Sequence, residues 1–232
     1  MDQIAANLGT IREQIAAAAE KSGRHPSDIR LVAVCKTHPA GAVAAAVAAG
    51  QRVFGESRVQ EAREKIPACP PGLDWHFIGH LQKNKVRQAL PLFSFFHSID
   101  SPALAQAIDR IAGEMGKPVE GLLEVNISGE ETKHGFTPDE LRKEFAALAK
   151  LPHLRIRGLM TMAPYSENQE DARPYFRALR ELRDELQSAH NHSLPELSMG
   201  MSGDFEPAIE EGATLVRVGS SIFGERPQQN EK

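Results

Sequence analysis

Eight short apolar segments alternate with segments of helical periodicity along this chain of 232 residues. The apolar segments span residues 31–36, 52–55, 74–79, 95–98, 119–126, 154–160, 196–199 and 214–218, and helical patterns lie between them near residues 40–49, 57–66, 83–90, 102–114, 138–150, 169–188 and 205–211. Strands that alternate with helices predict a parallel sheet covered by helices. At this length the first choice is a closed (β/α)8 barrel, the TIM barrel. An open doubly wound sheet is the alternative.

An extra helix is predicted ahead of the first strand, over residues 2–22. Ile4, Leu8, Ile11 and Ile15 recur there at helical spacing, and Gly23 follows as a stop signal. No linker rich in Pro, Gly or Ser and no shift in composition divides the chain. We therefore expect one α/β domain over residues 1–232, with the barrel proper at about residues 28–226.

Composition and charge exclude several classes of protein. The net charge of −4 provides no global attraction to nucleic acid or to an anionic membrane, so we expect neither as a partner. No segment approaches the roughly 20 apolar residues of a membrane span, and the N-terminal segment lacks the pattern of a signal peptide. Cys35 and Cys69 form no C-x-x-C pair, which favours a reducing compartment. We expect a cytoplasmic monomer, because no long apolar stripe is evident.

Lys36 follows the apolar run 31–35 and precedes Thr37, His38 and Pro39, which end that run. Desolvation at the end of a buried strand favours the neutral amine, and a neutral lysine amine can attack a carbonyl to form a Schiff base. A lysine whose stem is buried and whose charge reaches water is the alternative.

Two turns near the C-terminus indicate an anion site. Residues 197–204 and 216–224 each contain a strand, a turn rich in Gly and Ser, and a helix start. Small residues let backbone N–H groups approach an anion, and hydroxyl groups add donors. In barrels, the loops after the seventh and eighth strands often bind phosphate. Arg217 lies inside the last strand, where it needs either a carboxylate or a ligand as partner.

The remaining motifs give weaker evidence of function. His76 and His80 are four residues apart, but a strand end and a glycine separate them. They therefore lack the helical geometry of a zinc pair, no third ligand is evident, and we predict no metal site. The basic segment 82–87 is predicted to be a solvated helix face. Signatures of serine hydrolases, P-loop enzymes, Rossmann dehydrogenases and zincins are missing from the sequence.

Six segments together resemble one family closely. They are residues 33–37 (AVCKT), 54–57 (FGES), 75–85 (WHFIGHLQKNK), 157–162 (RGLMTM), 197–202 (LSMGMS) and 216–224 (VRVGSSIFG). In this order they are similar to the pyridoxal phosphate homeostasis proteins. The resemblance runs from about residue 5 to residue 226, and several motifs in register make it specific.

The resemblance implies a fold type III barrel that binds pyridoxal 5′-phosphate (PLP), similar to the N-terminal domain of alanine racemase and to eukaryotic ornithine decarboxylase. It implies PLP bound as an internal aldimine on Lys36. By motif position, Ser202, Gly219 and Ser220 would hold the phosphate, and Arg217 would face the pyridine nitrogen. The remaining candidate cofactor-binding residues are Met201, Gly203, Ser221 and Ser57. The family is regarded as controlling the supply of PLP and has no settled catalytic reaction.

Residue 57 departs from the family pattern. The family usually has asparagine after Phe-Gly-Glu, and this chain has Ser57. Serine keeps a hydrogen-bonding hydroxyl group but reaches less far, which weakens the expectation that this position contacts the cofactor directly.

The implied function is a carrier that buffers PLP and takes part in its homeostasis, with apo-forms of PLP enzymes as candidate recipients. The alternative is an amino-acid racemase or decarboxylase. In the racemases of the related fold, a second domain supplies a tyrosine and covers the site. Here Tyr165 is the one tyrosine expected at the barrel mouth, and all 232 residues are used by the barrel. A barrel aldolase with Lys36 as the Schiff-base lysine fits the lysine and the phosphate turns but not the ordered motifs.

Overall fold

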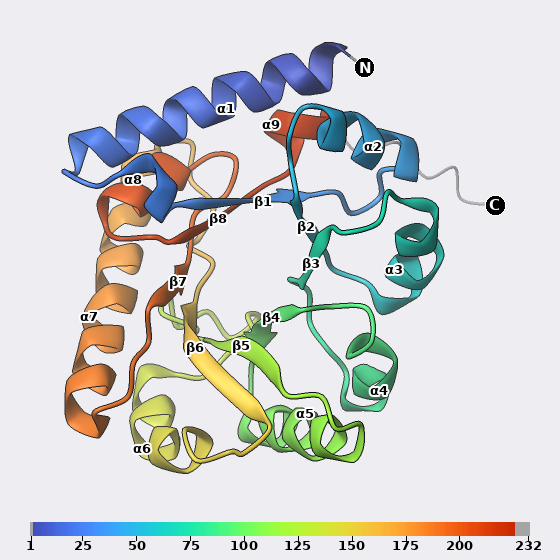
Figure 1. Cartoon of the computed structure of the whole chain (residues 1–232). Coiled ribbons are helices and arrows are strands. Elements are labelled where there is room, and N and C mark those ends of the chain that lie inside the picture. The colour runs from blue at the N-terminus through green and yellow to red at the C-terminus, as the bar shows by residue number, and fades with distance from the viewer. Residues whose placement is uncertain (1, 226–232) are drawn as a thin grey trace.

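The computed structural model describes residues 2–225 and contains a closed barrel of eight parallel strands in sequential order (Figure 1). The strands are β1 (Arg30–Val34), β2 (Val53–Glu56), β3 (Asp74–Phe77), β4 (Phe95–Ile99), β5 (Val119–Glu124), β6 (Leu154–Met160), β7 (Glu196–Ser198) and β8 (Leu215–Val218). Pairing of β1 with β8 closes the barrel. The predicted TIM barrel is therefore confirmed, and the open sheet is excluded.

Helices surround the barrel as the alternation predicts (Figure 1). They are α1 (Asp2–Lys21), α2 (Ala40–Ala48), α3 (Val59–Lys65), α4 (Val86–Ala89), α5 (Pro102–Glu114), α6 (Pro138–Leu148), α7 (Arg173–His190), α8 (Phe205–Glu210) and α9 (Ser220–Phe223), with short 3-10 helices η1 (Pro26–Asp28), η2 (Ile66–Ala68), η3 (Lys83–Lys85) and η4 (Gln169–Ala172). Two predicted helices, 83–90 and 169–188, begin as 3-10 turns. The predicted domain also included residues 1 and 226–232, which lie outside the described residues.

Helix α1 lies across the outside of the barrel, next to α8 and α9 (Figure 1). Its apolar stripe of Leu8, Ile11 and Ile15 is buried in the core, as the spacing predicts. The Asn7 side-chain amide donates to the carbonyl oxygen of Ile222 at 2.9 Å. This extra helix therefore holds the segment that follows the last strand.

The barrel interior is filled by a small apolar layer and by polar groups. Val32, Phe95, Leu122, Met160 and Leu215 form an apolar cluster separate from the larger core. Packed side chains, not a pore, are expected inside an eight-stranded barrel.

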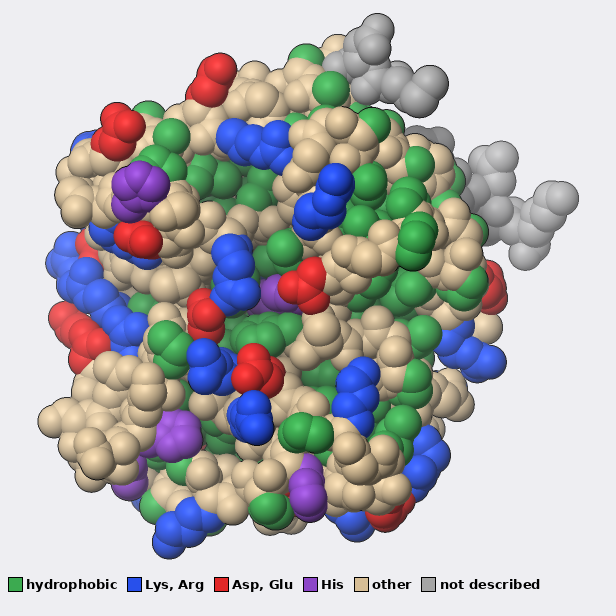
Figure 2. Space-filling view, in the orientation of Figure 1, with side chains coloured by type: hydrophobic (Ala, Val, Ile, Leu, Met, Phe, Trp, Pro, Cys, Tyr) green, Lys and Arg blue, Asp and Glu red, His purple; other side chains and the backbone are tan. Residues whose placement is uncertain are grey.

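No helix among residues 2–225 combines the length and the apolar character needed to cross a bilayer. Figure 2 shows acidic and basic side chains interspersed around the centre of one face. This mixture matches the nearly balanced composition.

A buried ion cluster ties α3 to the ends of β1 and β2. The Lys65 ammonium donates to the Cys35 carbonyl oxygen and to a Glu61 oxygen, both at 2.7 Å, and it also contacts the Glu56 carboxylate. Lys65 is 8% exposed and Glu56 is 0% exposed. Breaking a buried ion pair from one side leaves a charge without compensation, which is costly.

Replacing Lys65 with Met should lower the free energy of unfolding by about 3–5 kcal/mol, because Glu56 would keep a buried charge without its partner. Denaturant unfolding followed by circular dichroism measures the loss. Lys143→Met, at an exposed position of α6, is the matched control and should change stability little. An equal effect of both substitutions would contradict the role assigned to the cluster.

Candidate functional site

A cavity of about 700 Å³ lies at the carboxyl ends of β1, β7 and β8. This is the end of a (β/α)8 barrel where active sites occur, and the volume is within the usual range for small-molecule sites. Eight of the nine predicted site residues line it: Lys36, Met201, Ser202, Gly203, Arg217, Gly219, Ser220 and Ser221. The fold therefore brings the strand-end lysine and both late turns to one place.

Lys36 lies two residues beyond β1, later than the sequence pattern suggested, because a turn follows the strand. Its side chain is half-buried. Thr37 next to it has a left-handed φ of 67°, which is rare for a β-branched residue and costs about 1–3 kcal/mol. The Thr37 backbone N–H donates to Glu61 Oε1 at 2.6 Å, so the ion cluster also holds this conformation.

The two late turns meet beside the lysine. The Gly219 backbone N–H donates to Ser202 Oγ at 3.2 Å, which joins one turn to the other. A Cβ atom at Gly219 would lie 3.2 Å from the Val34 carbonyl oxygen, so glycine suits this crossing of β8 and β1. Helix α9 begins at Ser220, and the first amides of a helix have no partner within it.

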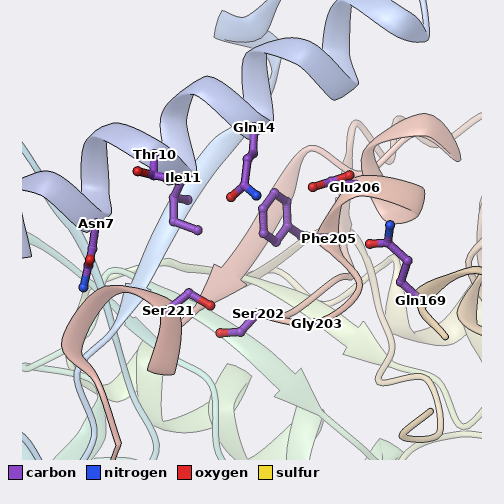
Figure 3. A pocket seen from close by; sticks show the side chains of 10 residues that line it. All are labelled: Asn7, Thr10, Ile11, Gln14, Gln169, Ser202, Gly203, Phe205, Glu206 and Ser221. Carbon is purple, nitrogen blue, oxygen red and sulfur yellow. The ribbon is translucent and has the colours of Figure 1, made fainter. Parts of the chain in front are cut away.

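A second, smaller cavity of about 370 Å³ lies behind these turns, under α1. Ser202, Gly203 and Ser221 line both cavities. In Figure 3 the side chains of Ser202 and Ser221 face each other beneath the α1 residues. The two serines therefore form part of the wall between the cofactor-sized cavity and the outer helix.

Arg217 enters the cavity from inside the barrel and is 5% exposed. It donates to Ser198 Oγ at 2.5 Å and to the Thr161 carbonyl oxygen at 3.0 Å. Burial lowers the pKa of Arg217 to about 10, while nearby Asp204 and Glu124 oppose that shift. The guanidinium therefore remains charged at neutral pH.

A chain of hydrogen bonds continues from Arg217 to the other end of the barrel. Ser198 Oγ lies 2.8 Å from His97 Nδ1, and His97 Nε2 lies 2.9 Å from His76 Nδ1. His76 Nε2 lies 3.2 Å from a carboxylate oxygen of Asp74, the first residue of β3. The interior of the barrel is thus a continuous polar path.

The direction of this chain fixes its protons. Arg217 can only donate, so the Ser198 oxygen accepts its hydrogen bond and the Ser198 hydroxyl group donates a hydrogen bond to His97 Nδ1. His97 and His76 then each carry a proton on Nε2, and the last proton points at the Asp74 carboxylate. Burial lowers the pKa of His97 well below its usual value, which agrees with a neutral His97 imidazole.

Glu124, the last residue of β5, is a buried ionisable group and is 5% exposed. Burial raises its pKa from 4.5 to about 7, and the negative charge of Asp100 adds to the shift, while Arg217 opposes it. Glu124 is therefore partly protonated near neutral pH.

Other predicted residues lie elsewhere. Ser57 is not among the residues that line the cavity. The Gly79 backbone passes so close to Ser57 that a Cβ atom on Gly79 would lie 2.2 Å from the Ser57 carbonyl oxygen. A contact between Ser57 and a cofactor stays a prediction. His76 belongs to the buried chain, whereas His80 is exposed and bonds to Asp100.

Several residues of the cavity escaped the sequence analysis. They include His38, Ile78, Asn168 and Gln169, together with residues 163–164 of the loop after β6. Their position after a strand was the available signal, because loops at the carboxyl ends of barrel strands converge. Tyr165, which the sequence placed at the mouth, does line the cavity.

The raised pKa of Glu124 predicts a pH-dependent effect of Glu124→Gln. The unfolded carboxyl group ionises near 4.5 and the folded one near 7, so the wild-type protein loses stability as pH rises between these values. The variant has no such loss. Its stability relative to wild type should rise across this window, by at most about 3 kcal/mol, and then level off. Denaturant unfolding at several pH values measures the difference.

Glu120→Gln, on the same strand with a 41% exposed side chain, is the matched control. A pH-independent difference in stability between Glu124→Gln and wild type would contradict the raised pKa of Glu124.

Comparison with known proteins agrees with this geometry. Residues 6–227 match the family model of the alanine racemase N-terminal domain. A pyridoxal phosphate homeostasis protein of Aquifex aeolicus is 47% identical, and the match covers 94% of this chain and 96% of that protein. The structure of PipY from Synechococcus elongatus with PLP bound is 42% identical, with a TM-score of 0.86 and coverage of 96% of this chain and 100% of that chain.

An alanine racemase of Clostridium difficile shares the fold. Its structure is 18% identical with a TM-score of 0.75, and the match covers 100% of this chain and 59% of the racemase. The nearer similarities extend over almost the full length of both partners. The chain therefore belongs to the alanine racemase N-terminal domain family and, within it, to the pyridoxal phosphate homeostasis proteins.

Proposed function

We propose that this protein binds PLP through Lys36 and carries and buffers the cofactor for PLP homeostasis. One observation supports this most: the cavity brings a half-buried lysine together with two turns of small and hydroxyl residues. A reactive amine and an anion cradle are the two features that an aldehyde with a phosphate group requires.

The residues present fit the chemistry of PLP. The Lys36 amine would add to the aldehyde carbon, and loss of water would leave an internal aldimine. The hydroxyl groups of Ser202, Ser220 and Ser221 and the backbone N–H groups of the α9 turn would bind the phosphate. Because imine formation is reversible in water, such a site can both store the cofactor and release it.

Arg217 supports storage over broad catalysis. A charged guanidinium beside the pyridine nitrogen would disfavour protonation of that nitrogen. An unprotonated pyridine withdraws electrons less strongly, so it stabilises carbanions poorly. The bond to Ser198 would hold Arg217 in place for this role.

The relatives support the same proposal. The printed names of the curated relatives describe PLP homeostasis, and the PipY structure contains PLP. Apo-forms of PLP enzymes in the cytoplasm would be the recipients, because they are the proteins that need the cofactor.

A racemase or decarboxylase of amino acids is the second candidate. Tyr165 favours it, because a tyrosine that lines the cavity could transfer a proton. Its side chain is 93% exposed, however, and an acid–base group needs a fixed position within about 0.5 Å of its working geometry. The carrier is therefore the better-supported function.

Lys36→Ala should abolish the visible absorption band that PLP forms with the protein and the adduct trapped by borohydride. Absorption spectra and mass spectrometry of the reduced protein measure both. Lys83→Ala, at an exposed position, is the control and should leave both unchanged. An adduct on another lysine, such as Lys133, in the otherwise unmodified protein would refute the assignment to Lys36.

The PLP-loaded protein should show no sustained reaction with D- or L-amino acids beyond that of free PLP at the same concentration. Chiral chromatography detects inversion, and a carbon dioxide assay detects decarboxylation. Transfer of PLP to an apo-enzyme should proceed under the same conditions. Continuous turnover that is lost in Tyr165→Phe would favour the racemase or decarboxylase instead.

A further inference from the structure

We propose that His80, Asp100 and His134 form a binding site for a divalent transition-metal ion, with Zn²⁺ as the best fit, at the rim of the barrel. Each residue offers a ligand atom, and these atoms all lie within 4.8 Å of one another. It is the one such group of three among residues 2–225. The three side chains lie outside the set that lines the cofactor-sized cavity, so this inference does not rest on the proposed function.

The fold delivers the three ligands from consecutive strands. His80 follows β3, Asp100 follows β4 and His134 follows β5. The carboxyl ends of neighbouring parallel strands meet at one rim, which is where barrel proteins build their sites. Sequence analysis found no third ligand because His134 is 54 positions after His80 in the chain.

The His80 and Asp100 loops are fixed to each other. The Ser98 hydroxyl group donates to the Gly79 carbonyl oxygen and joins the end of β4 to the loop after β3. The Ser101 hydroxyl group donates to Asp100 Oδ1 at 3.1 Å. The carboxylate therefore keeps one oxygen, Oδ2, directed at His80 Nδ1 at 2.8 Å.

The loop that carries His134 is pinned as well. The Phe136 N–H donates to the Glu124 carbonyl oxygen at 2.8 Å, and the Asn126 N–H donates to the Phe136 carbonyl oxygen at 2.9 Å. Gly135 has a φ of 113°, and a Cβ there would lie 2.9 Å from the Glu124 carbonyl oxygen. The close return of this loop to β5 thus places His134 over the rim.

The geometry suits a metal after two small changes. His80 Nδ1 and Asp100 Oδ2 are 2.8 Å apart, and they must separate to the roughly 3.4 Å between two tetrahedral ligands that each lie about 2.1 Å from Zn²⁺. The ion would take the place of the hydrogen bond between these atoms, and the metal-bound imidazole would use the Nδ1 lone pair and carry its one proton on Nε2. His134 stacks on His80 with ring centroids 4.1 Å apart, so its exposed ring must turn to direct a nitrogen at the ion.

The donor set and the local charge select the kind of ion. Two imidazoles and one carboxylate with open positions are typical of Zn²⁺ sites that also bind water, and of other divalent transition metals. Burial raises the pKa of Glu124 and the negative charge of Asp100 adds to that shift, so the two carboxyl groups repel each other when both are charged. A dication would offset that repulsion.

Titration of tag-free, PLP-loaded protein with Zn²⁺ in a calorimeter tests the site. We expect one Zn²⁺ per chain. His80→Ala and His134→Ala should each weaken binding by at least about 10- to 100-fold, because even loss of a residue that only supports a ligand has an effect of that size. Asp100→Asn should weaken it similarly.

The matched control removes two exposed imidazoles elsewhere, in the double variant His25→Ala/His153→Ala. It should bind Zn²⁺ as wild type does, and circular dichroism and PLP content should be equal across all variants. Absence of 1:1 binding to the wild-type protein, or equal binding by the rim variants and wild type, would overturn the proposal. So would loss of binding in the control alone.

Discussion

The hydrogen bonds between the first and last strands are the constraint on which the site depends. Pairing of β1 with β8 places Val32 opposite Arg217 and Ala33 opposite Val218. The chain leaves β1 toward Lys36 and leaves β8 toward Gly219, so the register of this pair sets the lysine beside the late turns. Residues almost two hundred positions apart thereby share one cavity, and a slip by one residue would turn Arg217 from the interior to the outside.

Arg217 then dictates what else the interior contains. A buried guanidinium must have hydrogen-bond acceptors, and the barrel supplies Ser198 and the Thr161 carbonyl oxygen. Ser198 in turn requires His97, and His97 requires His76. No buried side-chain nitrogen or oxygen among the described residues lacks a partner. Such a fully satisfied network allows a polar core to coexist with the apolar layer around Leu122.

Hydrophobic periodicity predicted the strands and most helices, because it depends only on residues near one another in the chain. The count of eight strands and the chain length then favoured a closed barrel. The lysine and both Gly/Ser turns were also predictable, since each sits directly after a strand. What sequence could not show was convergence between distant loops. The bond from Lys65 to the Cys35 carbonyl oxygen, the chain from Arg217 to Asp74 and the meeting of His80 with His134 each join different βα units. Contact of Ser57 with a cofactor stays a prediction: Ser57 follows β2, and it is not among the residues that line the cavity.

The left-handed backbone of Thr37 has a consequence for the lysine beside it. The segment itself supplies local bonds, from the Thr37 hydroxyl group to the Lys36 carbonyl oxygen and from the His38 N–H to the Cys35 carbonyl oxygen. The Thr37 N–H, however, donates to Glu61 on α3, 24 positions away. The direction in which the amine leaves the strand is therefore a property of the assembled tertiary structure, not of its own peptide. Capture of an aldehyde by Lys36 would accordingly report that the second βα unit has docked onto the first.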